Sequence, residues 1–160
     1  MRLELVLNDA PAALDVPPDR RVVDLLREEL GLKGTKESCG AGDCGACTIL
    51  VDGESRLSCL MLAAQLQGRA VTTVEGLSPD GSHPLQETFA AHGAVQCGYC
   101  TPGMLLAAAD LLARDPDPDR EAIREGLSGN LCRCTGYVKI VDAVAAASAA
   151  TVGVPDQRKR

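Results

Sequence analysis

Eight cysteines are the residues of this 160-residue sequence whose type and spacing suit a defined chemistry. They divide into two sets of four, and no cysteine is left over. The first set is Cys39, Cys44, Cys47 and Cys59, and the second is Cys97, Cys100, Cys132 and Cys134. Cysteine thiolates are soft ligands that suit zinc and iron–sulfur centres. Each set is therefore predicted to hold one metal centre, and two redox centres in so short a chain would form a wire for electrons.

The first set has the spacing C-x4-C-x2-C, followed by a distant fourth cysteine. This is the ligand spacing of a plant-type [2Fe–2S] cluster. Gly40, Gly42 and Gly45 allow positive φ angles, so the loop can curl around a cluster and direct its N–H groups at the sulfurs. Structural zinc fits poorly, because this glycine-rich loop is not the usual spacing of a zinc site. The sequence predicts a [2Fe–2S] cluster here.

The second set combines a C-x2-C pair with a C-x-C pair. The spacing alone leaves structural zinc open as an alternative to a second cluster. Tyr99 and Tyr137 flank these cysteines, where they would either shield a cluster from water or simply pack. A disulfide framework is disfavoured by the close spacing of the ligands. The N-terminus has no signal-peptide pattern, so a reducing, cytoplasmic location is expected.

Composition excludes several classes of function. The formal charge of −6 comes without a basic stripe, which argues against binding to nucleic acid. No stretch of about 18 apolar residues exists, so no membrane span is predicted. We find no nucleophile–histidine constellation and no phosphate-binding glycine loop, and therefore assign no catalytic residue to this chain. His83 and His92 are expected to be structural or exposed, since a Rieske site would need two histidines in place of two cysteines.

The first half of the chain reads as a small mixed sheet crossed by one helix. Strands are expected over residues 3–7, 12–16, 48–51 and 70–74, and Asp52-Gly53 is a signal for a tight hairpin. Helices are expected over 22–30 and, more briefly, over 59–66. The loop-rich run 76–82 then changes the pattern and marks a boundary.

The second half reads as entirely helical. Helices are expected over 84–94, 101–114, 118–128 and 137–149, with Thr101 as the cap of the second helix and Pro102 in its first turn. Four helices in so short a stretch predict a compact bundle, with both cysteine pairs in inter-helix loops that meet at one end. The fold class is thus α+β, with domains at 1–76 and 77–150 and a polar tail at 151–160.

Three sequence runs carry a resemblance to a known family. They are Glu37-Ser-Cys-Gly-Ala-Gly-Asp-Cys-Gly-Ala-Cys47, Gln96-Cys-Gly-Tyr-Cys-Thr-Pro-Gly-Met104 and Ser128-Gly-Asn-Leu-Cys-Arg-Cys-Thr-Gly-Tyr137. In this order they resemble the small iron–sulfur subunit of the xanthine oxidase family of molybdenum hydroxylases, which includes carbon monoxide dehydrogenase, over roughly residues 1–150. The resemblance implies a plant-ferredoxin-like (β-grasp) domain and a four-helix domain, each with one [2Fe–2S] cluster.

The resemblance also implies a role. This chain would be the non-catalytic electron-transfer subunit of an oxidoreductase complex. Electrons would pass from a molybdopterin cofactor on a large subunit through the two clusters to FAD on a medium subunit or to another acceptor. Gln96 and Cys134 match the family positions that lie against the pterin; without the family, Gln96 would be read as a buried amide that satisfies local backbone. The glycine-rich loops around Cys44 and around 97–100 are the expected partner interfaces.

Two alternatives stand beside this interpretation. A free-standing two-cluster ferredoxin would carry electrons by diffusion, although such a carrier needs only the first domain. A zinc-stapled interaction module would use the same cysteines without redox chemistry. Iron and acid-labile sulfide, rather than zinc, would exclude the module.

Overall fold

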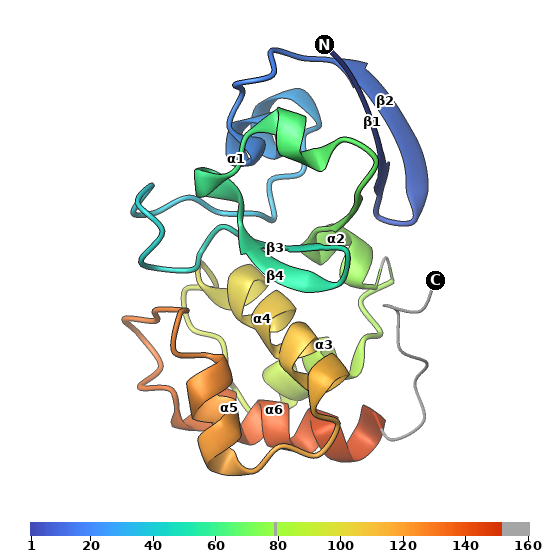
Figure 1. Ribbon diagram of the computed structural model, residues 1–160. Helices are drawn as coiled ribbons and strands as arrows, with labels where there is room; N and C mark the ends of the chain where they lie inside the picture. The colour runs from blue at the N-terminus through green and yellow to red at the C-terminus, as the bar shows by residue number, and fades with distance from the viewer. Residues whose placement is uncertain (79, 152–160) are drawn as a thin grey trace.

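The computed structural model describes residues 1–78 and 80–151 of the chain (Figure 1). Most of the predicted tail, residues 152–160, lies outside the described residues. The first half contains a five-stranded mixed sheet of order β2-β1-β5-β3-β4. Its strands are β1 (Arg2–Leu7), β2 (Ala10–Asp15), β3 (Thr48–Val51), β4 (Glu54–Leu57) and β5 (Ala70–Thr72). Strands β1 and β5 pair in parallel and the other pairs are antiparallel, so the predicted mixed sheet is confirmed.

Both predicted hairpins form around two-residue turns. Asn8 and Asp9 take φ angles of 50° and 64°, and Asp52 and Gly53 take 51° and 80°. Two consecutive residues with positive φ match the right-handed twist of the flanking strands. The first turn is shorter than expected, so β2 begins at residue 10 and not at 12.

The helix expected over 22–30 is present, but in two forms. An α-helical turn, α1 (Val22–Asp24), continues as a π-helical turn, η1 (Leu25–Glu29). The prediction of a single helix over 59–66 is wrong. Two short 3-10 turns replace it, η2 (Ser58–Leu60) and η3 (Ala63–Leu66), because Leu62 between them forms an extended bridge to Arg21. A short helix that was not predicted, α2 (Val74–Leu77), follows β5.

Four further helices follow and confirm the helical second half. They are α3 (Pro84–Ala91), α4 (Thr101–Arg114), α5 (Arg120–Gly126) and α6 (Val138–Thr151). The predicted Thr101 cap is wrong. Helix α4 begins at Thr101, and Cys100 is the capping position without a side-chain bond, because its backbone is already helical. Within the described ranges, no helix is both long and apolar enough to cross a bilayer.

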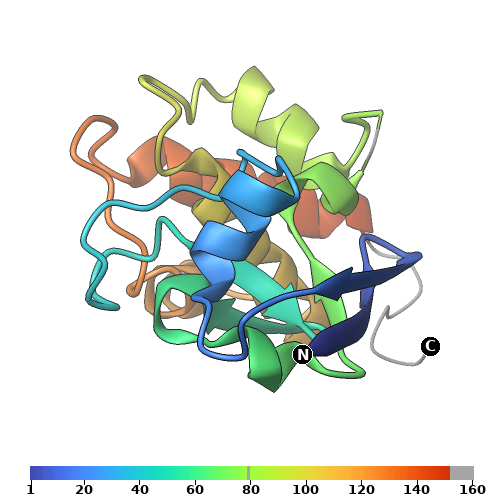
Figure 2. The same ribbon diagram turned by 90° about the horizontal axis from the view of Figure 1, so that it is seen from above.

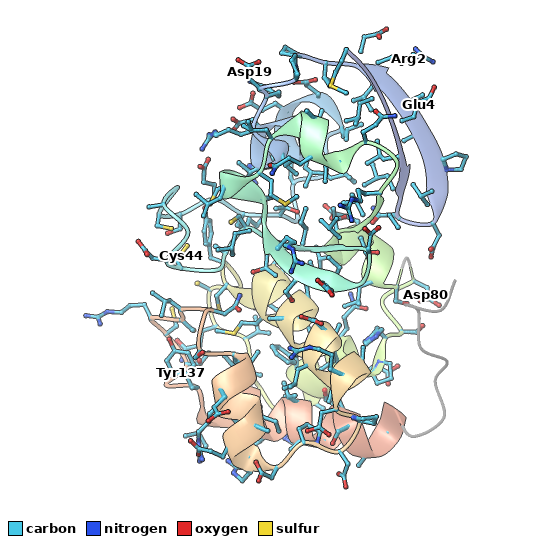
Figure 3. The ribbon with its side chains drawn as sticks, in the orientation of Figure 1. Arg2, Glu4, Asp19, Cys44, Asp80 and Tyr137 are labelled. Carbon is cyan, nitrogen blue, oxygen red and sulfur yellow. The ribbon has the colours of Figure 1, made fainter. Side chains whose placement is uncertain are left out.

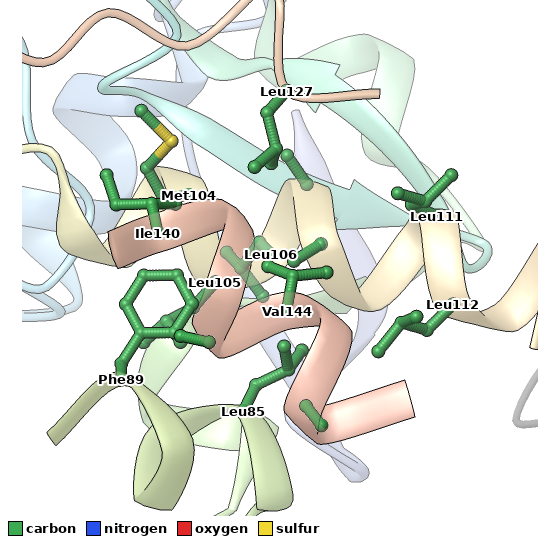
Figure 4. Close-up of a cluster of buried hydrophobic side chains, with 14 of the residues drawn as sticks. Leu85, Phe89, Met104, Leu105, Leu106, Leu111, Leu112, Leu127, Ile140 and Val144 are labelled. Carbon is green, nitrogen blue, oxygen red and sulfur yellow. The ribbon is translucent and has the colours of Figure 1, made fainter. Parts of the chain in front are cut away.

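The helices pack around a core of leucine and alanine with one phenylalanine. Figure 4 shows side chains of α3, α4 and α6 converging there, with Phe89 and Leu85 facing Ile140 and Val144. Phe89, Leu85 and Ile140 are each at most 1% exposed. With so few aromatic residues, this core depends on close packing of aliphatic side chains. The helix ends and loops around it position the cysteines.

Strand β3 links this core to the core of the sheet. Ile49 and Val51 belong to the core formed by β1, β5, α1, η1 and η3, whereas Leu50 belongs to the helical core. Successive side chains of a strand point to opposite faces, so one strand supplies both cores. Figure 1 shows β3 and β4 between the upper part of the molecule and α4. The two halves therefore meet over a packed, apolar contact.

This shared strand predicts cooperative unfolding. Leu50→Ala is expected to destabilise the chain by about 2–5 kcal/mol, because it removes buried methyl groups from the contact between the halves. The change should lower one melting transition that covers both halves, as measured by circular dichroism. Leu60→Ala is the matched control, since Leu60 is 59% exposed. Two separate transitions, with only one of them shifted, would contradict the expectation.

Candidate metal centres

The cysteine-bearing loops gather on one side of the molecule. The first loop lies between η1 and β3, the C-x2-C pair between α3 and α4, and the C-x-C pair between α5 and α6. Both pairs of the second set thus lie in inter-helix loops, as predicted. Figures 1 and 2 show all three loops projecting toward the same side, and Figure 3 labels Cys44 and Tyr137 there.

Within each set the thiols contact one another two by two. The Sγ atoms of Cys97 and Cys134 are 3.7 Å apart. The other contacting pairs are Cys39 with Cys44, Cys47 with Cys59, and Cys100 with Cys132. All eight thiols are free. The predicted meeting of the C-x2-C and C-x-C pairs is therefore confirmed.

This pairing fits a dinuclear cluster. The four cysteines of a [2Fe–2S] cluster are shared between two irons, two thiolates to each. Two contacting pairs per site are the donor arrangement for one such cluster.

The backbone of the first loop is directed at a cysteine sulfur. The N–H groups of Ala41 and Asp43 donate to Sγ of Cys39, each at 3.4 Å, and Gly40 and Gly42 take φ angles of 63° and 88°. Hydrogen bonds from the backbone of Ala41 and from Cys44 lower the pKa of the Cys39 thiol to about 6. The predicted role of the glycines is confirmed: they let the loop turn its N–H groups toward a thiolate.

Two other cysteines of the predicted sites lie in apolar surroundings. Burial raises the pKa of Cys59 to about 11 and that of Cys100 to about 12. Both groups would be neutral thiols at pH 7 without a nearby cation, because burial penalises the charged form. A bound metal reverses this preference, since a coordinating thiol loses its proton. The donor set therefore fits a cationic centre that offsets the cost of two buried thiolates.

The second site contains two hydrogen-bonding side chains that sequence reasoning did not assign. The hydroxyl of Thr135 donates to Sγ of Cys132 at 3.1 Å, and the Thr135 N–H donates to it at 3.5 Å. Burial alone would raise the pKa of Cys132, but these bonds outweigh it and lower the pKa to about 7. The hydroxyl of Tyr137 accepts the N–H of Cys132 at 2.8 Å. The sequence feature that could have identified Thr135 is its hydroxyl, directly after the last cysteine.

Gln96 and Cys134 lie together, as expected of the two positions singled out from the family. The side-chain amide of Gln96 donates to the carbonyl oxygen of Cys134 at 3.0 Å, and both residues are exposed. Gln96 does satisfy a backbone carbonyl, but that of a residue 38 positions away, and at the surface rather than in a buried position. The pair forms a polar rim beside the Cys97–Cys134 thiols.

A hollow of about 430 Å³ lies between the loops. All four cysteines of the second set line it, together with Cys44 and Ala46 of the first loop and both tyrosines. The hydroxyl of Tyr99 donates to the carbonyl of Glu37, two residues before the first ligand, so Tyr99 joins the two loops. The hollow lies beside the four cysteines of the second set, and it also borders the first loop.

One of the two stretches expected to form partner interfaces, the loop around Cys44, is partly covered by the chain itself. The carbonyl of Cys44 accepts the N–H of Leu131 at 2.9 Å, and Gly45 is buried. This stretch is occupied by the chain itself, because the two halves dock through it. The loop around residues 97–100 and the run from Cys39 to Ala41 remain at the surface.

Comparisons with known proteins agree with this geometry. The model of the 2Fe-2S iron-sulfur cluster binding domain matches residues 5–72, and that of the [2Fe-2S] binding domain matches residues 73–145. The nicotinate dehydrogenase small FeS subunit of Eubacterium barkeri is 49% identical over 143 residues, which cover 89% of this chain and 91% of that protein. The xanthine dehydrogenase iron-sulfur-binding subunit of Escherichia coli O157:H7 is 47% identical over 146 residues, which cover 89% and 91%.

Solved structures are similar over nearly the whole chain. A chain of quinoline 2-oxidoreductase from Pseudomonas putida 86 superposes with a TM-score of 0.89 at 49% identity, covering 96% of this chain and 97% of that one. Aldehyde oxidoreductase from Desulfovibrio gigas superposes with a TM-score of 0.92 at 38% identity, covering 96% of this chain but only 17% of that much longer one.

Removal of the Thr135 hydroxyl is predicted to shift the redox potential of the second cluster. Thr135→Val is expected to lower the midpoint potential of the second cluster, by about 60 mV for each 1.4 kcal/mol of hydrogen-bond energy lost from the reduced state. The bond stabilises negative charge on the sulfur, so its loss disfavours reduction. An EPR-monitored titration measures the shift. Thr135→Ser is the matched control because it keeps the hydroxyl, and equal potentials in the two variants would contradict the prediction.

Proposed function

This chain belongs to the family of small iron–sulfur subunits of the molybdenum hydroxylases, and we propose how its residues serve electron transfer in such a complex. It is the non-catalytic subunit of an oxidoreductase, and its two [2Fe–2S] domains hold two clusters. When bound, each cluster accepts and releases one electron at a time. The observation that carries the assignment is the arrangement of the thiols in four contacting pairs on one side of the molecule.

The ligand assignment follows from the pairs. Cys39, Cys44, Cys47 and Cys59 hold the first cluster, and Cys97, Cys100, Cys132 and Cys134 hold the second. The N–H groups directed at Cys39 and the hydroxyl directed at Cys132 stabilise negative charge on these sulfurs. The apolar surroundings of Cys59 and Cys100 keep water away from the inner side of each cluster. Hydrogen bonds and burial of this kind set the potential of an iron–sulfur centre.

The second cluster is the one that meets the molybdenum-bearing partner in this proposal. Gln96 and Cys134 form an exposed polar rim, and an amide and a backbone carbonyl suit the hydrogen-bonding groups of a pterin. Exposed apolar side chains lie near the rim. Val95 directly precedes Gln96, and Tyr99 and Leu131 line the same hollow as Cys134; they are 41%, 46% and 55% exposed. Such side chains favour coverage by a partner subunit. Two relatives are themselves named as small subunits, which supports a large partner.

The remaining parts of the proposal concern the acceptor, the domains and the location. A medium subunit with FAD, or another acceptor, takes electrons from the first cluster, near the exposed run at Cys39–Ala41. Residues 1–76 form the ferredoxin-like domain, residues 77–150 form a four-helix domain, and 151–160 form a polar tail. The match of the two domain models to 5–72 and 73–145 supports a boundary close to this one. Eight free thiols suit a reducing compartment, so we assign a cytoplasmic location.

Analysis of the purified chain tests the assignment. About four irons per chain, with equal acid-labile sulfide, and two EPR signals after dithionite reduction are the expected results. Zinc without sulfide would instead make the chain a structural module.

The ligand sets can be separated by single substitutions. Cys134→Ser should remove the signal of the second cluster and leave that of the first, and Cys39→Ser should do the reverse. The reason is that each change removes one thiolate from one set only. Loss of the same signal in both variants would refute the proposed ligand sets.

The contact with the partner is tested in the assembled complex. Gln96→Ala should retain both cluster signals while slowing substrate-driven reduction of the second cluster, because the rim that faces the pterin loses its amide. Gln67→Ala is the control, since Gln67 lies in the first half and contacts the backbone of Glu4. A reduction rate equal to that of the wild type would exclude a role for Gln96.

A further inference from the structure

The two cysteine sites are joined by a junction of three backbone segments. The segments are Cys44–Gly45 of the first loop, Gly129–Leu131 before the C-x-C pair, and Gly103 in the first turn of α4. The N–H of Leu131 donates to the carbonyl of Cys44 at 2.9 Å. This bond joins a ligand of the first site to the residue that precedes a ligand of the second.

The segments approach so closely that neither Gly45 nor Gly103 can carry a side chain. A Cβ atom on Gly45 would lie 2.4 Å from the carbonyl oxygen of Gly129, and one on Gly103 would lie 2.3 Å from the carbonyl oxygen of Gly45. Both contacts are with backbone, which cannot move aside as the end of a flexible side chain can. Glycine at these positions therefore sets how near the two sites come.

A single side chain, that of Asn130, fills the centre of the junction. Its Nδ2 donates to the carbonyl of Gly45 at 2.9 Å and to Oγ1 of Thr48 at 3.3 Å. Thr48 in turn donates to the same carbonyl at 2.7 Å. Asn130 is 6% exposed and Thr48 is 3% exposed, so these bonds form away from water. A buried amide with both donor directions used holds its partners in one geometry.

We propose that Asn130 is a positioning residue that fixes the separation and orientation of the two clusters, and thereby the rate of electron transfer between them. The proposal rests on the proposed function in that both sites must hold clusters. Asn130 touches no ligand sulfur. It acts through the peptide of Gly45, which follows Cys44 directly, and through its own chain, which reaches Cys132 two residues later.

The side chain has this role because backbone contacts alone leave freedom at the junction. One hydrogen bond between Leu131 and Cys44 fixes a distance but permits rotation about it. The bonds from Asn130 to Gly45 and Thr48 add two further points, and three points define an orientation. Thr48 begins β3, the strand that supplies both cores, so the junction is tied to the packed contact between the two halves.

The test uses the full chain loaded with both clusters, with Asn130→Ala as the first variant. Three properties are measured: the EPR signal of each cluster in partly reduced samples, the splitting that the two reduced clusters impose on each other, and the rate of electron equilibration after pulsed reduction. We expect both individual signals to persist, the mutual splitting to change, and equilibration to slow severalfold. Wild-type splitting together with a wild-type rate would overturn the proposal.

Thr48→Val tests the same junction from the other half of the chain. Valine keeps the shape of threonine and removes the hydroxyl that links Asn130 to Gly45. The splitting should change in the same direction as in Asn130→Ala, and the double variant should resemble Asn130→Ala alone, because both changes act on one carbonyl. Effects that simply add would overturn the proposal.

Ser128→Ala is the matched control, since Ser128 lies in the same turn and donates only to the carbonyl of Glu125. It should leave the splitting and the rate unchanged. If Asn130→Ala lost one cluster while Thr48→Val behaved like the wild type, Asn130 would be a folding requirement for one site, and the positioning role would be refuted. Absence of two clusters in the wild type would instead refute the proposed function, so the two failures are distinguishable.

Discussion

The structure depends on the electrostatic cost of placing four thiols side by side. Four thiolates at contact distance repel one another, and two of those in this chain, Cys59 and Cys100, also lie where burial favours the neutral form. A metal cluster removes both costs, because its cationic irons attract the thiolates that would otherwise repel. The fold also stabilises negative charge on two of the sulfurs, because N–H and hydroxyl donors are directed at Cys39 and Cys132. The cysteine loops and the cluster therefore stabilise each other electrostatically.

A second constraint is steric and links the two halves. Electron transfer through a chain of centres requires them to be close, and closeness requires small residues where backbone meets backbone. Gly45 and Gly103 satisfy this requirement, since a Cβ on Gly45 would collide with the peptide oxygen of Gly129 and one on Gly103 with that of Gly45. Strand β3 adds the apolar contact that holds the halves together, with Leu50 facing the helices. The two halves therefore form a docked pair in which the redox sites face one another.

Much of the local structure could be predicted because it follows from local rules. Hairpins at Asn8-Asp9 and Asp52-Gly53, the strand at 48–51 and the helix at 101–114 all form where turn residues and periodicity indicate. The predictions of local structure that were wrong share a cause. The expected helix at 59–66 breaks because Leu62 pairs with Arg21, and Thr101 does not cap α4 because Cys100 already has a helical backbone. In both cases a distant pairing or a neighbouring loop outweighed the local preference.

The sequence by itself determined the number of the metal centres and the type of the first, since cysteine spacing and glycine content are written along the chain. At the second set the spacing left zinc open, and the resemblance to a family favoured a cluster. The sequence also determined the family, through three motifs in order. Only the tertiary structure decided which thiols contact which, that Thr135 and Tyr137 bond to the second site, and that Asn130 lies between the loops. The physical reason is distance along the chain. Gly45 and Asn130 are 85 residues apart, and no local pattern records a contact that only the packing of two cores creates.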